Sequence, residues 1–208
     1  MDRASDHHDI VIHGWGMLPA LLALHLLAKE PGSRVLLLCG DSAVGGDQLE
    51  PVVADRLCPA ARELATSCCV AQWEGYYIVR DGDAALHTEP VWLLDPVQLW
   101  LNITEQAARC TARTGCSTVG ADDQAGRYID LAALTLPQAE SEIRGNELVR
   151  QLGLPILADF DSAPPGWHAH QMLPLGDERV MVRRLPLRTS LVAATTSFES
   201  LLNALVGE

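Results

Sequence analysis

Positive charge is scarce in this sequence. Its 208 residues include 15 Lys and Arg against 27 Asp and Glu, which gives a formal net charge of −12 at pH 7, and Lys29 is the only lysine. Affinity for nucleic acid depends on basic side chains that neutralise phosphates, and docking on anionic lipid depends on the same charges. The composition therefore argues against a nucleic-acid partner and against electrostatic binding to a membrane surface.

Long apolar runs and cysteine pairs are also missing. The longest apolar stretch, Met17–Ala28, holds 12 residues and contains His25, whereas a membrane-spanning helix needs about 20. The N-terminus shows no basic start followed by an apolar run, so we expect no secretory signal, no membrane span and a cytoplasmic location. None of the six cysteines forms a CxxC pair, which favours reduced, mostly buried thiols over a zinc site.

The rest of the composition, 48% hydrophobic and 20% charged, is typical of a globular domain, and its start predicts a βαβ unit. Asp9–His13 is typical of a buried strand, Met17–Lys29 of a helix with Pro19 in its first turn, and Arg34–Cys39 of a second buried strand. Proline is tolerated in the first turn of a helix. A strand, a glycine turn, a helix and a strand within about 30 residues predict that the two strands are parallel.

Further helix and strand patterns follow along the chain. Asp95 is expected to cap the second of three later helices, and the stretch after Pro137 is expected to be a connection. Helices are predicted at Pro59–Ser67, Pro96–Thr114 and Ser197–Val206, and strands at Ala71–Arg80, Ala85–Leu94, Arg127–Leu131, Leu154–Phe160, Trp167–Leu173 and Arg179–Leu185.

The glycine turn of the βαβ unit is an altered phosphate-binding motif. Such a turn binds phosphate when backbone N–H groups and the helix N-terminus point at it. Here the pattern is Gly14-x-Gly16-x-x-Pro19, bulky Trp15 stands within the turn, and Cys39 takes the place of the acid that holds a ribose hydroxyl. Two interpretations remain: a βαβ unit retained for packing, or a working dinucleotide site.

Two stretches carry a resemblance to a known family. DIVIHGWGMLPALLALHLL followed by RVLLLCGDSAVGG, and later PILADFD with GWHAHQMLPLGDERVMV, resemble bacterial lycopene β-cyclases, flavoproteins that close the end rings of carotenoids. The resemblance covers most of residues 9 to 185. It implies an α/β fold with a Rossmann-like βαβ core of the flavoprotein type and an antiparallel sheet like that family's substrate domain. Members of the family are longer, and the C-terminal part that completes their flavin site has no counterpart in this sequence.

The same resemblance predicts how the chain is organised. We expect a single compact unit, 1–208, with two interleaved parts. Residues 9–50 and about 95–136 would form the dinucleotide-fold-like part. Residues about 51–94 and 150–190 would form the part like the substrate sheet.

The departures from the family predict that its cofactor site is degraded. Gly14, Gly16, Gly45 and Gly46 match the cofactor-binding glycines, but an Asp-Gln-Leu-Glu run replaces the family's pattern after the paired glycines. The family's acidic pair after the Leu-Pro-Leu turn is matched here by Arg183-Arg184, and a guanidinium does not donate a proton near neutral pH. We therefore expect these glycines to be vestigial and the protein to bind no cofactor. The alternative is that the altered motif still binds FAD.

The last predicted hairpin carries residues that could replace the family's acidic pair in proton transfer. If Pro174 lies opposite Arg179, then His170 lies opposite Arg183, and alternation places His168 on the same face. A histidine and an arginine on an apolar face would suit a general base beside an anion-stabilising group. The alternatives are an exposed polar face of an edge hairpin and a two-histidine metal pair, for which no third ligand is evident.

Acidic residues provide further candidates. Glu50 and Asp47 lie where the family's pocket begins, and either could replace the missing acid. Asp159 and Asp161 form either a general-acid pair or the entry to a loop.

Two functions therefore remain open. One is a cofactor-independent, non-redox cyclase or isomerase acting on a hydrophobic or polyene small molecule. The other is a non-catalytic binding or partner protein on a relict flavoprotein fold, forming a homodimer or serving as a partner subunit. The sequence does not identify the substrate.

Overall fold

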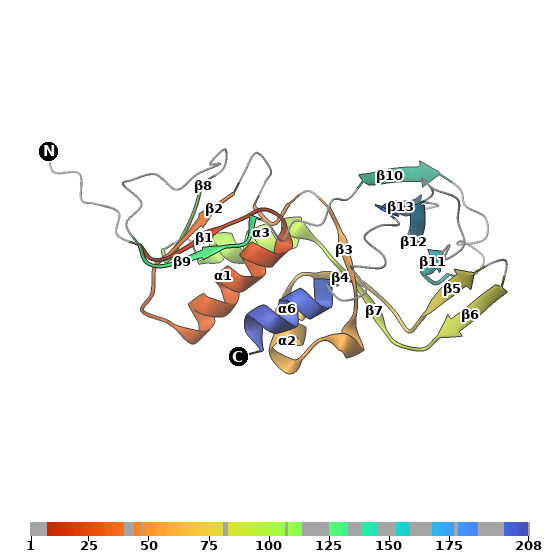
Figure 1. Ribbon diagram of the computed structural model, residues 1–208, viewed down its shortest axis with the longest axis horizontal. Helices are drawn as coiled ribbons and strands as arrows, with labels where there is room; N and C mark the ends of the chain where they lie inside the picture. The colour runs from red at the N-terminus through yellow and green to blue at the C-terminus, as the bar shows by residue number, and fades with distance from the viewer. Residues whose placement is uncertain are drawn as a thin grey trace, which may run out of the picture.

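A computed structural model of the chain places a parallel sheet at one end of the molecule and an antiparallel sheet at the other, with a small sheet between them (Figure 1). The structure describes residues 8–39, 44–46, 48–80, 83–106, 108–113, 125–132, 139–144, 153–158, 168–176, 179–186 and 198–207. In this part of the chain, no helix combines the length and the apolar character needed to cross a bilayer.

The parallel sheet contains the predicted βαβ unit. Strand β1 (His8–His13) runs into helix α1 (Met17–Lys29), which returns to the parallel strand β2 (Val35–Leu38). Strands β8 (Cys110–Arg113) and β9 (Ala125–Asp130) complete the order β8-β2-β1-β9, with every neighbouring pair parallel. The expected α/β fold with a Rossmann-like core is confirmed.

One helix is shorter than predicted. Helix α3 (Pro96–Glu105) begins as expected, with the Asp95 carboxylate accepting a hydrogen bond from the N–H of Val97 at 2.7 Å. It ends at Glu105 rather than near Thr114, because Cys110–Arg113 pairs with β2 as strand β8. This pairing is a long-range interaction that local sequence does not encode.

The main core lies between the parallel sheet and the helices. Alternate residues of β1 and β2, Ile10, Ile12, Val35 and Leu37, face Leu21 of α1, Leu99 of α3 and Leu202 of α6 (Phe198–Val206). Helix α1 contacts α2 (Pro59–Ser67), α3 and α6. The intervening strand residues Val11, Leu36 and Leu38 form a separate buried cluster on the other face of the sheet.

Helix α6 is fixed to the middle of the chain by two polar side chains. The buried Glu199 carboxylate accepts a hydrogen bond from the N–H of Val53 at 2.9 Å. The amide of Asn203 accepts from the N–H of Cys58 at 2.8 Å and donates to the carbonyl of Arg56 at 2.6 Å. These bonds satisfy backbone groups of Val53, at the end of β3, and of Arg56 and Cys58 in the segment that follows it.

The small central sheet has the order β3-β7-β4, formed by β3 (Glu50–Val53), β7 (Val91–Leu94) and β4 (Cys69–Trp73). The sequence predicted continuous strands over 71–80 and 85–94, and both are divided. The second part of the first predicted strand, β5 (Tyr76–Arg80), and the first part of the other, within β6 (Asp83–His87), pair in the antiparallel sheet instead. The first of the two breaks includes Gly75, where a Cβ would clash with the carbonyl oxygen of His87.

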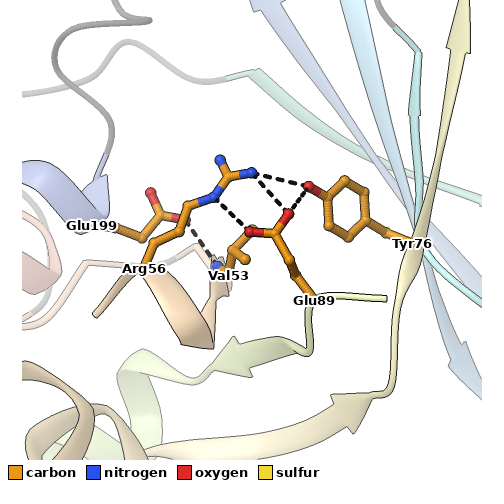
Figure 2. Close-up of polar contacts among 5 residues, drawn as sticks. All are labelled: Val53, Arg56, Tyr76, Glu89 and Glu199. Carbon is orange, nitrogen blue, oxygen red and sulfur yellow. Dashed lines mark hydrogen bonds and ion pairs between the residues drawn. The ribbon is translucent and has the colours of Figure 1, made fainter. Parts of the chain in front are cut away.

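A polar clamp joins these two sheets (Figure 2). Arg56, in the 3₁₀ helix η1 (Ala54–Arg56), donates through Nε and Nη2 to the carboxylate of Glu89 at 3.3 and 3.1 Å, and through Nη2 to the Tyr76 hydroxyl at 3.0 Å. Tyr76 in turn donates to Glu89 at 2.8 Å and stacks on His87 with ring centroids 5.0 Å apart. The hydrogen bonds from Arg56 and then from Tyr76 lower the pKa of the Glu89 carboxyl.

The antiparallel sheet has the order β10-β13-β12-β11-β5-β6. It contains β10 (Ala139–Arg144), β11 (Ile156–Ala158), β12 (His168–Gly176) and β13 (Arg179–Pro186). Strand β10 corrects the expectation of a connection after Pro137. The polar sequence of β10 did not indicate a strand, and the segment becomes one by pairing with β13.

The register of the β12–β13 hairpin differs from the predicted one. His170 pairs with Arg184, and Arg183 pairs with Gln171. An irregularity between Pro174 and Gly176 shifts the pairing by one residue. His170 and Arg183 are therefore not cross-strand partners.

Candidate functional site

The strand order of the parallel sheet identifies one end as the candidate site. Strand β1 connects through α1 to β2 on one side, whereas its neighbour on the other side, β9, comes much later in the chain, so the strand order reverses at β1. In open α/β sheets, ligands bind in the crevice at the carboxyl ends of strands where the order reverses in this way. Here β1 ends at His13 and β9 ends at Asp130, and these two residues are register partners.

His13 and Asp130 form a hydrogen-bonded pair at this edge. The distance from His13 Nδ1 to Asp130 Oδ1 is 3.2 Å, and the same oxygen accepts a bond from the N–H of Ala132 at 3.0 Å. The His13 side chain is 9% exposed and that of Asp130 is 55% exposed. The ring of Trp15 meets the imidazole edge-on, with centroids 6.0 Å apart.

The second nitrogen of the imidazole has no partner. His13 Nε2 is buried and makes no hydrogen bond in the described structure. Because a carboxylate only accepts hydrogen bonds, Nδ1 carries the proton in the bond to ionised Asp130. In the neutral imidazole, Nε2 is then an acceptor with a free lone pair.

The glycine turn lies directly beside this pair. Gly14 donates its N–H to the carbonyl of Leu38 at 3.0 Å. A Cβ on Gly14 would lie 2.9 Å from Cγ of Pro19, so the proline ring packs on the turn. Gly16 has a φ of 84°, and an added Cβ would meet no atom of the described residues within 4 Å. The turn thus keeps its glycine conformation and leaves open space at Gly16.

The second predicted glycine pair reaches the same place. Gly45 and Gly46 have φ values of 84° and 85°, and Val44 forms a parallel bridge with Gly16. A Cβ on Gly46 would lie 3.1 Å from Cα of Gly16. The structure therefore brings together all four glycines that the sequence assigned to the altered cofactor motif.

The described residues at this edge do not fit a dinucleotide held in the usual way. Cys39, directly after β2, is 3% exposed and offers no carboxylate to a ribose hydroxyl. Pro19 is the third residue of α1 and has no N–H to give to a phosphate. The nearest downstream acids, Asp41 and Asp47, lie outside the described residues. The turn has the backbone shape of a phosphate cradle without the polar groups that would complete it.

The other residues predicted from the sequence are distributed over the second half of the fold. Glu50 begins β3 and is partly buried, opposite Leu94. His168, His170 and Arg183 lie in β12 and β13, and the structure describes only their backbone pairing. Asp159 lies outside the described residues. The catalytic roles assigned to these residues stay predictions.

The cysteines agree with the expectation of buried thiols where the structure describes them. Cys39, Cys68 and Cys110 are buried, and Cys58 and Cys69 are partly buried. Burial raises the pKa of Cys68 to about 12 and that of Cys110 to about 11. Over the described part of the chain, no three His, Cys, Asp or Glu side chains are grouped so that they could hold a metal ion.

Sequence reasoning missed His13 and Asp130. His13 was treated as the end of one predicted strand and Asp130 as part of another, and neither was considered a candidate. The available signal was their position, because each is the last residue of a parallel strand, and carboxyl ends of such strands meet at one edge.

Comparison with known proteins places the chain among flavoprotein structures by fold. No protein-family model matches the sequence, and no curated protein matches it. Among solved structures, a probable FAD-dependent monooxygenase, pqsL, from Pseudomonas aeruginosa is 14% identical, with a TM-score of 0.52 over 96% of this chain and 70% of that one. A geranylgeranyl bacteriochlorophyll reductase-like protein from Thermoplasma acidophilum is 11% identical, with a TM-score of 0.58 over 97% and 62%.

A third similar structure is the myxobacterial FAD-dependent halogenase CndH, which is 11% identical, with a TM-score of 0.53 over 93% of this chain and 55% of that one. The chain thus spans between 55% and 70% of the length of these three proteins. At such low identity the comparisons show the fold alone. That fold is the α/β fold of FAD-dependent enzymes.

Proposed function

We propose that this protein is a cofactor-independent enzyme of the flavoprotein fold that catalyses a non-redox cyclisation or isomerisation of a hydrophobic or polyene small molecule. The substrate binds at the carboxyl edge of the parallel sheet, beside the glycine turn. The resemblance to lycopene β-cyclases supports this reaction class. The fold shared with a geranylgeranyl reductase-like protein is consistent with an isoprenoid-like substrate.

One observation carries this proposal: the turn keeps the glycine backbone of a ligand-binding motif but has lost side chains that would hold a dinucleotide. Open space at Gly16 and the positive φ of Gly45 and Gly46 are retained, as a ligand-binding crevice requires. The positions that would hold a dinucleotide carry Cys39 and Pro19 instead. The turn suits an apolar ligand better than a pyrophosphate, because Pro19 has no N–H to give to a phosphate and Cys39 has no carboxylate to give to a ribose.

The proposal is tested first by flavin content. The purified full chain is examined by visible absorption, then denatured, and its supernatant is analysed by mass spectrometry for flavins. We expect no flavin bands and no released flavin, also after incubation with FAD. A protein that retains FAD in a one-to-one ratio overturns the cofactor-independent reaction.

Binding is tested with all-trans-retinal, an apolar polyene aldehyde that quenches tryptophan fluorescence on close approach. We expect saturable quenching in the native chain and a smaller quenching amplitude in Trp15→Phe. Trp100→Phe, which changes a tryptophan on the outer face of α3, serves as the matched control and should keep the site-specific quenching. Equal loss in the two variants, or no saturable quenching, contradicts binding at the sheet edge.

An apolar surface on α3 favours a second function, that of a partner protein. Val97, Trp100 and Leu101 are 63%, 41% and 50% exposed and occupy one side of the helix at i, i+3 and i+4 spacing. Exposed apolar clusters of this kind mark protein contacts. If a second copy covers this surface, Leu101→Glu should convert a dimer to a monomer in light scattering, and a native monomer refutes the homodimer.

A further inference from the structure

The pair formed by His13 and Asp130 has the properties of a proton-transfer site. The two side chains come from neighbouring parallel strands and meet at the carboxyl edge of the sheet, next to the glycine turn. A buried polar atom without a partner destabilises a fold by about 1–3 kcal/mol, so such atoms are rare and call for an explanation. Nε2 of His13 is such an atom.

The arrangement of the two bonds gives the imidazole a defined chemical state. Asp130 holds the Nδ1 proton, and its oxygen is fixed in turn by the N–H of Ala132. The carboxylate therefore selects the tautomer and orients the ring, as a carboxylate does for a catalytic histidine. Trp15 restricts the ring from the side. The remaining lone pair on Nε2 has no partner among the described residues and is available to a ligand.

We propose that His13 is the general base of this enzyme, that Asp130 is its positioning residue, and that the substrate is a hydrophobic β,γ-unsaturated carbonyl compound. This inference rests on the proposed function and narrows its substrate class. Nothing in the fold comparison assigns a role to either residue.

The carbonyl follows from the strength of the base. An imidazole exchanges its proton near neutral pH, and proton transfer is efficient only when the acid and the base are not too far apart in strength. A C–H bond flanked by a double bond and a carbonyl is acidic enough for such a base. An allylic C–H bond of a hydrocarbon polyene is far too weak an acid, and an imidazolium is too weak an acid to protonate its double bond.

The reaction balances without an oxidant or a reductant. The Nε2 lone pair takes the proton from the carbon between the carbonyl and the double bond, and the C–H electron pair forms a dienolate. The dienolate then takes a proton from Nε2–H at the γ-carbon, and the double bond moves into conjugation with the carbonyl. His13 returns to its neutral Nδ1–H form.

The state of the imidazole is tested by NMR on the full chain labelled with ¹⁵N-histidine. We expect the His13 resonances of the native protein to show the Nδ1–H tautomer with Nε2 unprotonated. Asp130→Ala should shift the ring toward a mixture of tautomers, whereas Asp130→Asn, which keeps an oxygen acceptor, should preserve more of the native form. A native ring protonated at Nε2 alone overturns the assignment of the base, whatever the flavin content.

Catalysis is tested with two probes, a long-chain β,γ-unsaturated ketone and the hydrocarbon diene of the same length. We expect the native chain to move the double bond of the ketone into conjugation and to leave the diene unchanged. In D₂O, the proton taken from the α-carbon should be found at the γ-carbon, with little deuterium incorporated. His13→Gln should lower kcat by about 100- to 10,000-fold. Asp130→Asn should lower kcat with little change in KM, because it acts through the orientation of His13.

The outcomes separate this inference from the proposed function. Turnover of the diene by a flavin-free protein supports the proposed function and overturns the carbonyl substrate. Turnover of neither probe, or full activity in a folded His13→Gln protein, overturns the proton-transfer role. Flavin-dependent turnover overturns the proposed function itself. His25→Gln is the control for a buried histidine on α1, outside the sheet edge, and should keep the native kcat.

Discussion

Replacing His13 by an apolar residue is expected to stabilise the fold. His13→Leu removes the unpartnered Nε2, which destabilises the native state by about 1–3 kcal/mol. It also removes the bond to Asp130, and a bond of this kind contributes about 0.5–1.5 kcal/mol. That contribution is at the low end here, since the 3.2 Å contact is long and the Asp130 side chain, 55% exposed, returns to water.

The local packing supports the same direction. By strand alternation, His13 shares a face of β1 with Val11, which forms a buried cluster with Leu36 and Leu38. A leucine at the end of this row would extend the cluster. The three contributions together predict that His13→Leu raises the free energy of unfolding by about 0.5–2 kcal/mol.

The measurement is urea unfolding followed by tryptophan fluorescence and by far-UV circular dichroism, with midpoint and slope compared between variants. Leu36→Ala, on the same face and fully buried, is the control and should lower stability by about 2–5 kcal/mol. A His13→Leu protein that loses more than about 1 kcal/mol would show that the imidazole is a structural residue, with the orphan nitrogen satisfied in solution.

Three further predictions concern the frame around the site. Glu199→Ala should lower stability by about 1–3 kcal/mol in urea unfolding, because the buried N–H of Val53 loses its acceptor, while Glu199→Gln keeps an oxygen there and should lose less. Gly46→Ala should lose at least about 1 kcal/mol through its positive φ, whereas Gly32→Ala, with free space around it, should change little; equal losses contradict this. Cys68 keeps its proton in the folded state to a pKa of about 12 but releases it near 9.0 when unfolded, so stability should fall by about 1.4 kcal/mol per pH unit between these values. Unfolding measured across this pH range should show a shallower fall in Cys68→Ala.

The first half of the parallel sheet could be predicted because its signals are local. The apolar runs of β1 and β2, the glycine turn and Pro31-Gly32 after α1 lie within a single stretch of chain. Each marks a boundary through its own backbone preferences. The bounds of α1 agree with the prediction at both ends.

Elements defined by distant partners could not be predicted in the same way. Cys110–Arg113 becomes a strand by pairing with β2, and the carbonyl of His87 in β6 leaves no room for a side chain at Gly75, between β4 and β5. The hairpin register depends on a bulge near Pro174. None of these partners can be identified from local propensity, because the same residues suit a helix end or a continuous strand equally well.

The candidate site has the same limitation. His13 and Asp130 are 117 residues apart in sequence, and only the placement of β9 beside β1 brings them together. The glycines were found because their spacing is a local motif. The polar pair was missed because its members share no motif and become neighbours through the order of the sheet.

The two proposed functions make opposite demands on this pair. A protein that acts only as a partner through the α3 surface gains nothing from an unsatisfied imidazole at the end of β1. Natural proteins are only marginally stable, and groups that lower stability are typically those on which activity depends. If His13→Leu is more stable and still forms the same assembly through Leu101, while isomerisation of the ketone is lost, the imidazole is present for chemistry. If His13→Leu is less stable and the native protein shows no turnover, the pair has a structural role and the partner function is favoured.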